Sequence, residues 1–254
     1  MKVLSSGCYK GSRKYNGDII GIFDNMWYVI DGSTAVFNDN KFFETSDLYE
    51  YMQLLNKNIS NNEEVKDNLK RAINESNKKL VGIENYFEYE LPTFTIAVVK
   101  ECEDKIETYQ LCDTLISILY KDGSVENIED RRIDPVKNVC RSRKREILAM
   151  QDISDEERKK LILKNEQVTR KKVNIENGFP VGSTKVESIE QGIIRYFDKE
   201  KIDKILICSD GLYDSEEMLP DSSSDFEINN VENRVKEILT KEKRDDLSYI
   251  LIEI

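Results

Sequence analysis

The stretch Lys204-Ile-Leu-Ile-Cys-Ser-Asp-Gly-Leu-Tyr-Asp214 decides how this sequence is interpreted. Its first half is apolar and rich in isoleucine, which is typical of a buried strand. The apolar run then stops at Asp210-Gly211. A carboxylate at the end of a strand projects past the core while its backbone stays rigid. Rigid placement is what a metal site with oxygen ligands requires.

Acidic residues end or precede three other apolar runs. Asp31-Gly32 follows Trp-Tyr-Val-Ile, Asp113 follows Tyr-Gln-Leu-Cys, and Asp245-Asp246 precedes the last apolar run. Each of these sites alone is more typical of a turn than of a metal ligand, and we interpret Asp122-Gly123 as a turn only. Spacing alone does not bring the four sites together. Carboxylates that did meet would raise one another's pKa, so a divalent cation would be needed to keep them ionised.

The composition excludes several kinds of chemistry. The 254 residues include no histidine, so Ser-His-Asp and Cys-His triads and histidine-ligated zinc are ruled out. The five cysteines form no CxxC pair, which favours reduced thiols in the cytoplasm over a zinc or dithiol site. A net charge of −11 disfavours nucleic acid and anionic lipid, and no apolar run approaches the ~20 residues of a membrane span. We therefore expect neither nucleic acid nor a membrane as a partner.

The order of strand and helix patterns favours an α+β fold. Hairpin-like groups of strands alternate with paired helices, and strict βαβ alternation is absent, which indicates mainly antiparallel sheets. Strands are predicted at 18–23, 26–31, 93–99, 105–112, 114–120, 188–197, 204–208 and 247–254. One helix is predicted at 45–58, and a second begins at a capping box at 60–63. The segment over about 136–172 is predicted to be helical, with a capping box at 154–157, and the last helix is predicted at 227–239.

Two basic stretches accompany the acidic strand ends. Arg13-Lys-Tyr-Asn-Gly-Asp18 leads into the first predicted strand, and an arginine there could grip phosphate oxygens with its planar fork. The cluster Arg141–Arg145 lies in the charged helical segment and could contact an acidic or phosphorylated partner. Taken alone, a solvated turn and a solvated helix face are the better interpretations of these two stretches.

Taken in order, these motifs resemble the metal-dependent Ser/Thr protein phosphatases of type 2C, in particular the bacterial members. The resemblance extends from Gly11 to Ile254, and the ordered set is more specific than any single motif. Its segments are Arg13, Asn16 and Asp18; Asp31-Gly32; Pro92 to Val99; Cys112-Asp113-Thr114; Ser209 to Asp214, the strongest; and Asp245-Asp246-Leu247-Ser248.

The resemblance implies a β-sandwich of two mainly antiparallel sheets flanked by helices, in a single domain over 1–254. The charged segment at about 136–172 then corresponds to the family's variable flap. It also implies two Mn²⁺ or Mg²⁺ ions, with a third in some bacterial members. The implied ligands of the two ions are Asp31, the Gly32 carbonyl, Asp210 and Asp245, and Asp113 with Asp210 would hold the third. Asp18 would support the site, and Arg13 would bind the phosphate.

The implied activity is hydrolysis of phosphoserine or phosphothreonine in proteins by a metal-activated water, without a covalent intermediate. The expected partner is a phosphorylated protein, either a cognate kinase or its target, and the expected state is a cytoplasmic monomer. Two alternatives stay open. Ser33-Thr34-Ala35 and Cys112 depart from glycines of the family pattern, which favours a silent phosphatase-like module that binds a phosphorylated or acidic partner. The third hypothesis is a hydrolase of a small phosphorylated molecule.

Overall fold

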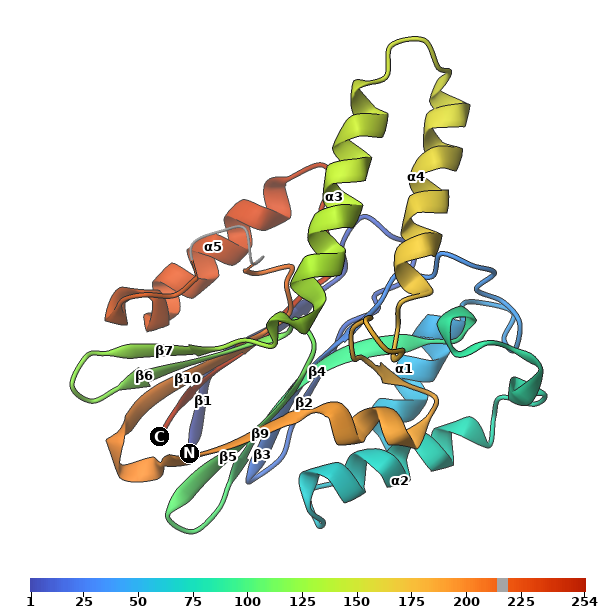
Figure 1. The fold of residues 1–254 in the computed structure, drawn as a ribbon. Helices are drawn as coiled ribbons and strands as arrows, with labels where there is room; N and C mark the ends of the chain where they lie inside the picture. The colour runs from blue at the N-terminus through green and yellow to red at the C-terminus, as the bar shows by residue number, and fades with distance from the viewer. Residues whose placement is uncertain (214–218) are drawn as a thin grey trace.

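Two antiparallel sheets lie face to face in the computed structural model, which describes residues 1–213 and 219–254 (Figure 1). Asp214 of the motif Ser209–Asp214 lies outside the described residues. The first sheet has the order β1(Lys2–Tyr9)-β11(Leu247–Glu253)-β10(Ile202–Cys208)-β6(Leu115–Tyr120)-β7(Val125–Ile128). The second has the order β2(Ile19–Ile22)-β3(Met26–Gly32)-β4(Thr93–Glu101)-β5(Lys105–Leu111)-β9(Ile193–Asp198), with β8(Gly182–Ser183) paired to β4. The predicted α+β class with two mainly antiparallel sheets is confirmed.

Alternation along the strands sorts side chains between two cores. On β3, Trp27 and Val29 point between the sheets, whereas Tyr28 and Ile30 point to the outer face. The central layer is built almost wholly from branched aliphatic side chains of both sheets, including Val99, Ile116, Ile205, Ile207, Ile250 and Ile252. Because both faces of the central strands are buried, their sequences are continuously apolar, which made them recognisable in the sequence.

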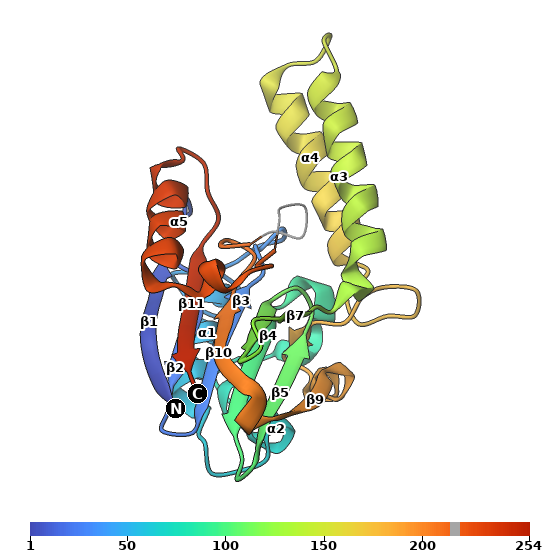
Figure 2. The ribbon, with the colours of Figure 1, turned by 90° about the vertical axis from the view of Figure 1, so that its left-hand side faces the viewer.

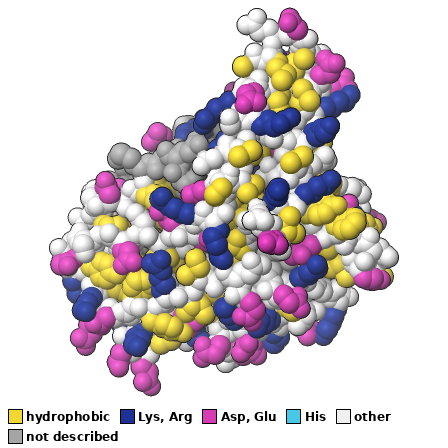
Figure 3. Space-filling model, viewed as in Figure 1, with side chains coloured by type: hydrophobic (Ala, Val, Ile, Leu, Met, Phe, Trp, Pro, Cys, Tyr) yellow, Lys and Arg dark blue, Asp and Glu magenta, His cyan; other side chains and the backbone are white. Residues whose placement is uncertain are grey.

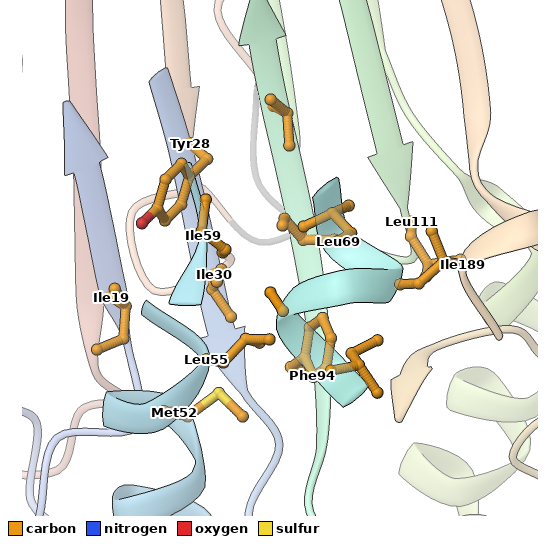
Figure 4. Close-up of a cluster of buried hydrophobic side chains, with 14 of the residues drawn as sticks. Ile19, Tyr28, Ile30, Met52, Leu55, Ile59, Leu69, Phe94, Leu111 and Ile189 are labelled. Atoms are coloured by element: carbon orange, nitrogen blue, oxygen red, sulfur yellow. The ribbon is translucent and has the colours of Figure 1, made fainter. Parts of the chain in front are cut away.

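Helices cover the outer face of each sheet. α1(Asp47–Asn58) and α2(Val65–Asn77) pack on the second sheet, where Met52, Leu55 and Leu69 meet Ile30 and Phe94 (Figure 4). α5(Ile228–Thr240) packs on the first sheet through its apolar stripe, Val231, Val235 and Ile238. Each fully buried aliphatic side chain of this kind contributes about 1.5–3 kcal/mol of transfer free energy. These layers fix the backbone from which the strand ends project.

A helical hairpin stands away from the sandwich. α3(Asp134–Ala149) and α4(Asp155–Arg170) pack against each other and extend beyond the ends of the sheets (Figures 1 and 2). The predicted capping box at Ser154 forms: its hydroxyl accepts from Glu157 N, and the Glu157 carboxylate accepts from Ser154 N. No helix in the described ranges is long and apolar enough to cross a membrane.

Two sequence predictions of local structure are wrong, and two edge strands were not predicted. The strand predicted at 188–197 is β9 only from Ile193, because Val186–Gln191 forms a 3-10 helix. No capping box forms at Ser60, because α2 begins at Val65 without a side-chain cap. The Ser60 hydroxyl instead accepts a hydrogen bond from Arg71. The edge strands β1 and β7 were not predicted. β1, Lys2–Tyr9, is half-buried and rich in small polar residues, so its sequence carries no strong strand pattern.

Candidate active site

The acidic strand ends meet at one end of the sandwich. Six of the seven predicted site residues line one cavity of about 300 Å³, namely Arg13, Asp31, Gly32, Asp113, Asp210 and Asp245. The strands explain this convergence: β3 and β10 end here, whereas β2, β6 and β11 begin here, and antiparallel register places their termini side by side. The base of the helical hairpin forms another wall of the cavity through Cys140 and Thr169.

Glycine follows Asp31 and Asp210 because other backbone segments pass too close for a side chain. A Cβ on Gly32 would lie 2.6 Å from the carbonyl oxygen of Gly17, and one on Gly211 would collide with the carbonyl oxygen of Asp246. Gly32 itself ends strand β3 and donates its N–H to Gly17 O at 3.2 Å. These Asp-Gly pairs therefore mark close packing between strand ends. Asp122-Gly123, by contrast, is the predicted turn: Gly123 has φ +87° and no neighbouring atom in Cβ reach.

The carboxylates at this end share buried negative charge. Burial, followed by the charges of Asp18, Asp210, Asp113 and Asp245, raises the pKa of Asp31 well above its ordinary value. Burial likewise raises the pKa of Asp210 to about 6, against the opposing effect of the Lys137 ammonium. The protein therefore holds these groups where each would gain from a cation.

Asp18, the seventh predicted residue, lies behind the cavity. It is 3% exposed, and Ser248 Oγ donates to its Oδ2 at 2.7 Å. Burial raises the pKa of Asp18 to about 7, with Asp246 and Asp210 adding to the shift. Its Oδ1 is buried and has no hydrogen-bond partner among the described residues. The same holds for Oγ1 of Thr95, a residue that lines the cavity. An unpartnered buried carboxylate oxygen is unfavourable unless a proton or a cation meets it.

Asp246 has a structural role that the sequence did not reveal. The two oxygens of its buried carboxylate accept from Gly11 N at 2.6 Å and from Gly17 N at 2.7 Å. These two bonds tie the segment that carries Arg13 to the start of β11. Asp245, next in the chain, has a side chain that is 48% exposed and faces the cavity. The Asp245 carboxylate thus faces the cavity, whereas the Asp246 carboxylate holds the backbone in place.

Cations of the chain itself contact the cavity carboxylates. Arg13 Nη2 lies 2.8 Å from Asp245 Oδ1. Lys137, on α3, places its Nζ 3.0 Å from Asp113 Oδ2 and 3.2 Å from Asp210 Oδ2. Sequence reasoning missed Lys137, because its position depends on where the helical hairpin returns to the sandwich.

Arg170, at the end of α4, is a second cation that sequence reasoning missed. It lines the cavity and donates from Nη1 to Thr93 Oγ1 at 2.8 Å and from Nη2 to the carbonyl oxygen of Thr34 at 2.7 Å. Burial, helped by the charge of Arg13, lowers the pKa of the Arg170 guanidinium to about 10, so it stays charged at neutral pH. The cavity therefore presents two guanidinium groups beside its carboxylates.

Cys112 occupies a position where glycine is favoured. Its φ is +68°, in the left-handed region that residues with a Cβ rarely adopt. The side chain is buried against Val173, Phe179 and Val181, and its N–H donates to Asp130 Oδ2 at 3.0 Å. A glycine would adopt this backbone without strain, and this chain places a cysteine there.

The donor set suits a hard divalent ion. All candidate ligands are oxygens, the carboxylates of Asp31, Asp113 and Asp210 are partly buried, and the buried Asp18 Oδ1 lacks a partner among the described residues. As the side chains stand, no three acidic or cysteine groups in the described ranges are arranged to hold a metal together. Arg13 and Lys137 instead neutralise three of the carboxylates. The chemistry of the site therefore fits a metal, with the chain's own cations at its carboxylates.

Comparisons with known proteins agree with the fold. No family model and no curated protein sequence matches this chain. Solved structures match across its length. Stp1, a serine/threonine phosphatase from Staphylococcus aureus, is 17% identical with a TM-score of 0.56, covering 100% of this chain and 96% of that one. The PPM Ser-Thr phosphatase MsPP from Mycobacterium smegmatis, in complex with cacodylate, is 15% identical with a TM-score of 0.59, covering 100% of both chains.

A third match carries metal. The catalytic domain of the phosphatase PstP, in complex with two manganese ions, is 14% identical with a TM-score of 0.55, covering 98% of this chain and 96% of that one. The chain therefore has the fold of the bacterial PPM-type Ser/Thr phosphatases, which confirms the resemblance expected from its motifs. The roles of individual site residues stay predictions.

Proposed function

We propose that this protein is a Mn²⁺- or Mg²⁺-dependent phosphatase that hydrolyses phosphoserine or phosphothreonine in proteins. The observation that supports it most is the convergence of Asp31, Asp113, Asp210 and Asp245 with two arginines on one cavity of about 300 Å³. Carboxylates suit divalent ions, and guanidinium groups suit a phosphate, so the two halves of a phosphate-hydrolysing site lie together.

Each group has a proposed task. Asp31, the Gly32 carbonyl, Asp210 and Asp245 would hold two ions, and Asp113 with Asp210 offers a further cation position that Lys137 contacts here. Ions of this class supply Lewis-acid activation of water and of the phosphate. Arg13, freed from Asp245, would bind phosphate oxygens, and Arg170, which also lines the cavity, would add positive charge. Asp246 keeps Arg13 in reach by fixing the backbone at Gly11 and Gly17.

The test is release of phosphate from p-nitrophenyl phosphate and from a phosphothreonine peptide, with and without Mn²⁺. We expect turnover that requires the metal and falls by at least about 100-fold in Asp210→Asn, because a central ligand supplies several kcal/mol of transition-state stabilisation. Asp122→Asn is the matched control, because Asp122 belongs to an exposed hairpin turn. Absence of metal-dependent turnover, or equal rates for the two variants, would refute the proposal.

A second candidate, a silent binding module, is favoured by one observation. Arg13 and Lys137 already occupy carboxylates that metal ions would need. Calorimetric titration with Mn²⁺ separates the two candidates: the phosphatase proposal requires binding that Asp31→Asn weakens, whereas a silent module binds no Mn²⁺ at this cavity. Rates on a panel of small phosphorylated molecules, set beside those on phosphopeptides, distinguish a small-molecule hydrolase.

A further inference from the structure

An apolar groove runs along the helical hairpin. Its volume is about 690 Å³, and both helices line it. Several of its apolar side chains are strongly exposed: Val139 by 69%, Val168 by 56% and Met150 by 43%. Hydrophobic side chains gather on this projecting part of the molecule in Figure 3. Apolar groups that are grouped and exposed are characteristic of a surface that binds something.

Few side chains of the two helices that line the groove are buried within this protein. Of the residues of α3 and α4, only Ile147 and Asn165 are buried. The hairpin projects beyond the sheets (Figure 2), and the apolar side chains of Val139, Met150 and Val168 along it are exposed. An isolated pair of helices that served only as a spacer would expose polar residues along this stripe. The exposed apolar side chains therefore call for a partner.

Charge indicates which partner. Residues 134–172 contain 12 Lys and Arg against 7 Asp and Glu, whereas the rest of the chain contains 26 against 42. Arg143, Lys164 and Lys172 line the groove, and Glu146 is the one acidic residue among those lining it in the described ranges. A ligand that fits must combine apolar side chains for the floor with acidic side chains for the rim.

The groove adjoins the candidate active site. Cys140 and Thr169 line both the groove and the cavity that contains Asp31 and Asp210. A polypeptide with a phosphorylated residue in the cavity would therefore run onto the hairpin. We propose that the groove docks an apolar and acidic segment of the phosphoprotein substrate, close in sequence to its phosphorylated residue. This proposal rests on the phosphatase function proposed above.

Docking is tested first without catalysis. The probes are a fluorescent, unphosphorylated peptide of alternating Leu and Glu and a matched peptide of Leu and Lys, each titrated with the protein in EDTA and followed by anisotropy. We expect binding of the acidic peptide alone, weakening with added NaCl. The double variant Val139→Ser/Val168→Ser should bind about tenfold more weakly, which is about 1.4 kcal/mol, since the bound peptide would cover these two exposed valines.

Two further variants make this result interpretable. Arg143→Gln/Lys164→Gln changes only exposed charge and should weaken binding of the acidic peptide as well. Val81→Ser removes a more exposed apolar side chain, 88% exposed and outside the groove, and should leave binding unchanged. Equal binding of both peptides, or equal binding by the wild type and both groove variants, would overturn the proposal. So would a dimer of the protein that dissociates in Val139→Ser/Val168→Ser, because a second copy would then be the occupant.

Catalysis supplies an independent measurement. Phosphothreonine peptides with the Leu/Glu segment placed at several distances are compared with one that lacks it. We expect a higher kcat/KM, through KM, for at least one spacing, and loss of this preference in the groove variants. No preference at any spacing would show that the groove does not dock substrate. If no peptide is hydrolysed but the acidic peptide still binds at the groove, the phosphatase proposal fails while the binding surface stands.

Discussion

The ammonium of Lys137 lies 3.2 Å from the carboxylate of Asp210 and also contacts Asp113, so a helix of the projecting hairpin supplies a cation to the candidate metal site. All three side chains are roughly one-fifth exposed, so solvent screens the interaction only in part. The ammonium and an incoming metal ion would therefore compete for the same carboxylates. Metal binding would consequently be linked to the attachment of α3 to the sandwich.

Replacing Lys137 tests this link. Lys137→Met should destabilise the metal-free protein by about 1–3 kcal/mol, because two partly buried carboxylates lose their cation. The same variant should bind Mn²⁺ more tightly, because the competing charge is gone. Thermal unfolding in EDTA and calorimetric titration measure the two effects. Lys160→Met, which removes a cation from an exposed pair on α4, is the control. An unchanged melting temperature and an unchanged Mn²⁺ affinity would contradict the prediction.

The stability of the metal-free protein should fall as the pH rises from about 4 to about 7. Burial raises the pKa of Asp18 to about 7 and that of Asp210 to about 6, whereas both are near 3.9 in an unfolded chain. Between these values the folded state holds protons that the unfolded state has released, so deprotonation destabilises the fold. Urea unfolding in EDTA measures the trend.

Two changes should reduce this pH dependence. Asp18→Asn removes one titrating group and should flatten the decline. Saturating Mn²⁺ should raise the free energy of unfolding most at the high-pH end, where the carboxylates are ionised and ready to bind it. A metal-free protein that is equally stable at both ends of this range would show that folding does not raise the pKa of these carboxylates.

Gly211→Ala should disrupt the candidate active site by displacing the backbone next to Asp210. The new Cβ would collide with the backbone oxygen of Asp246, so either the loop that follows Asp210 or the start of β11 must shift. We expect a loss of about 2 kcal/mol or more in unfolding free energy and a large loss of phosphate release. Gly123→Asn, in the open turn at the far end of β6, is the comparison and should preserve both. Retention of full activity by Gly211→Ala would mean that the loop adjusts without moving Asp210.

At most positions an alanine variant is more stable than a glycine variant, but the left-handed backbone at Cys112 should reverse this order of stability. Cys112→Ala and Cys112→Gly both remove the thiol from its contacts with Val173 and Phe179. Only glycine relieves the strain of φ +68°, so the glycine variant should be more stable than the alanine variant by about 1 kcal/mol. Chemical denaturation of the two variants measures the difference. An alanine variant of higher stability would indicate that the backbone at residue 112 relaxes.

Patterns within single elements were predictable from the sequence, and relations between distant elements were not. The alternation in β3 and the acidic end at Asp31 are local properties, because one strand displays them alone. Asp246 differs from Asp245 only through Gly11 and Gly17, more than 220 residues away. Lys137 and Arg170 were hidden among the many basic residues of the helical hairpin, since nothing in that segment marks which side chains reach the cavity. Their roles depend on how two helices return to the sandwich.

With the proposed docking, the hairpin would also fix a distance along the substrate. From Val139 to Met150 the groove follows about 16 Å of helix, a distance that about five residues of extended chain would cover. Lys137 holds the lower end of this length against the carboxylates. The separation between a phosphorylated residue and a docked segment would then be set by the lengths of α3 and α4. Adding two turns to each helix should shift the preferred spacing outward without altering the chemistry at the cavity.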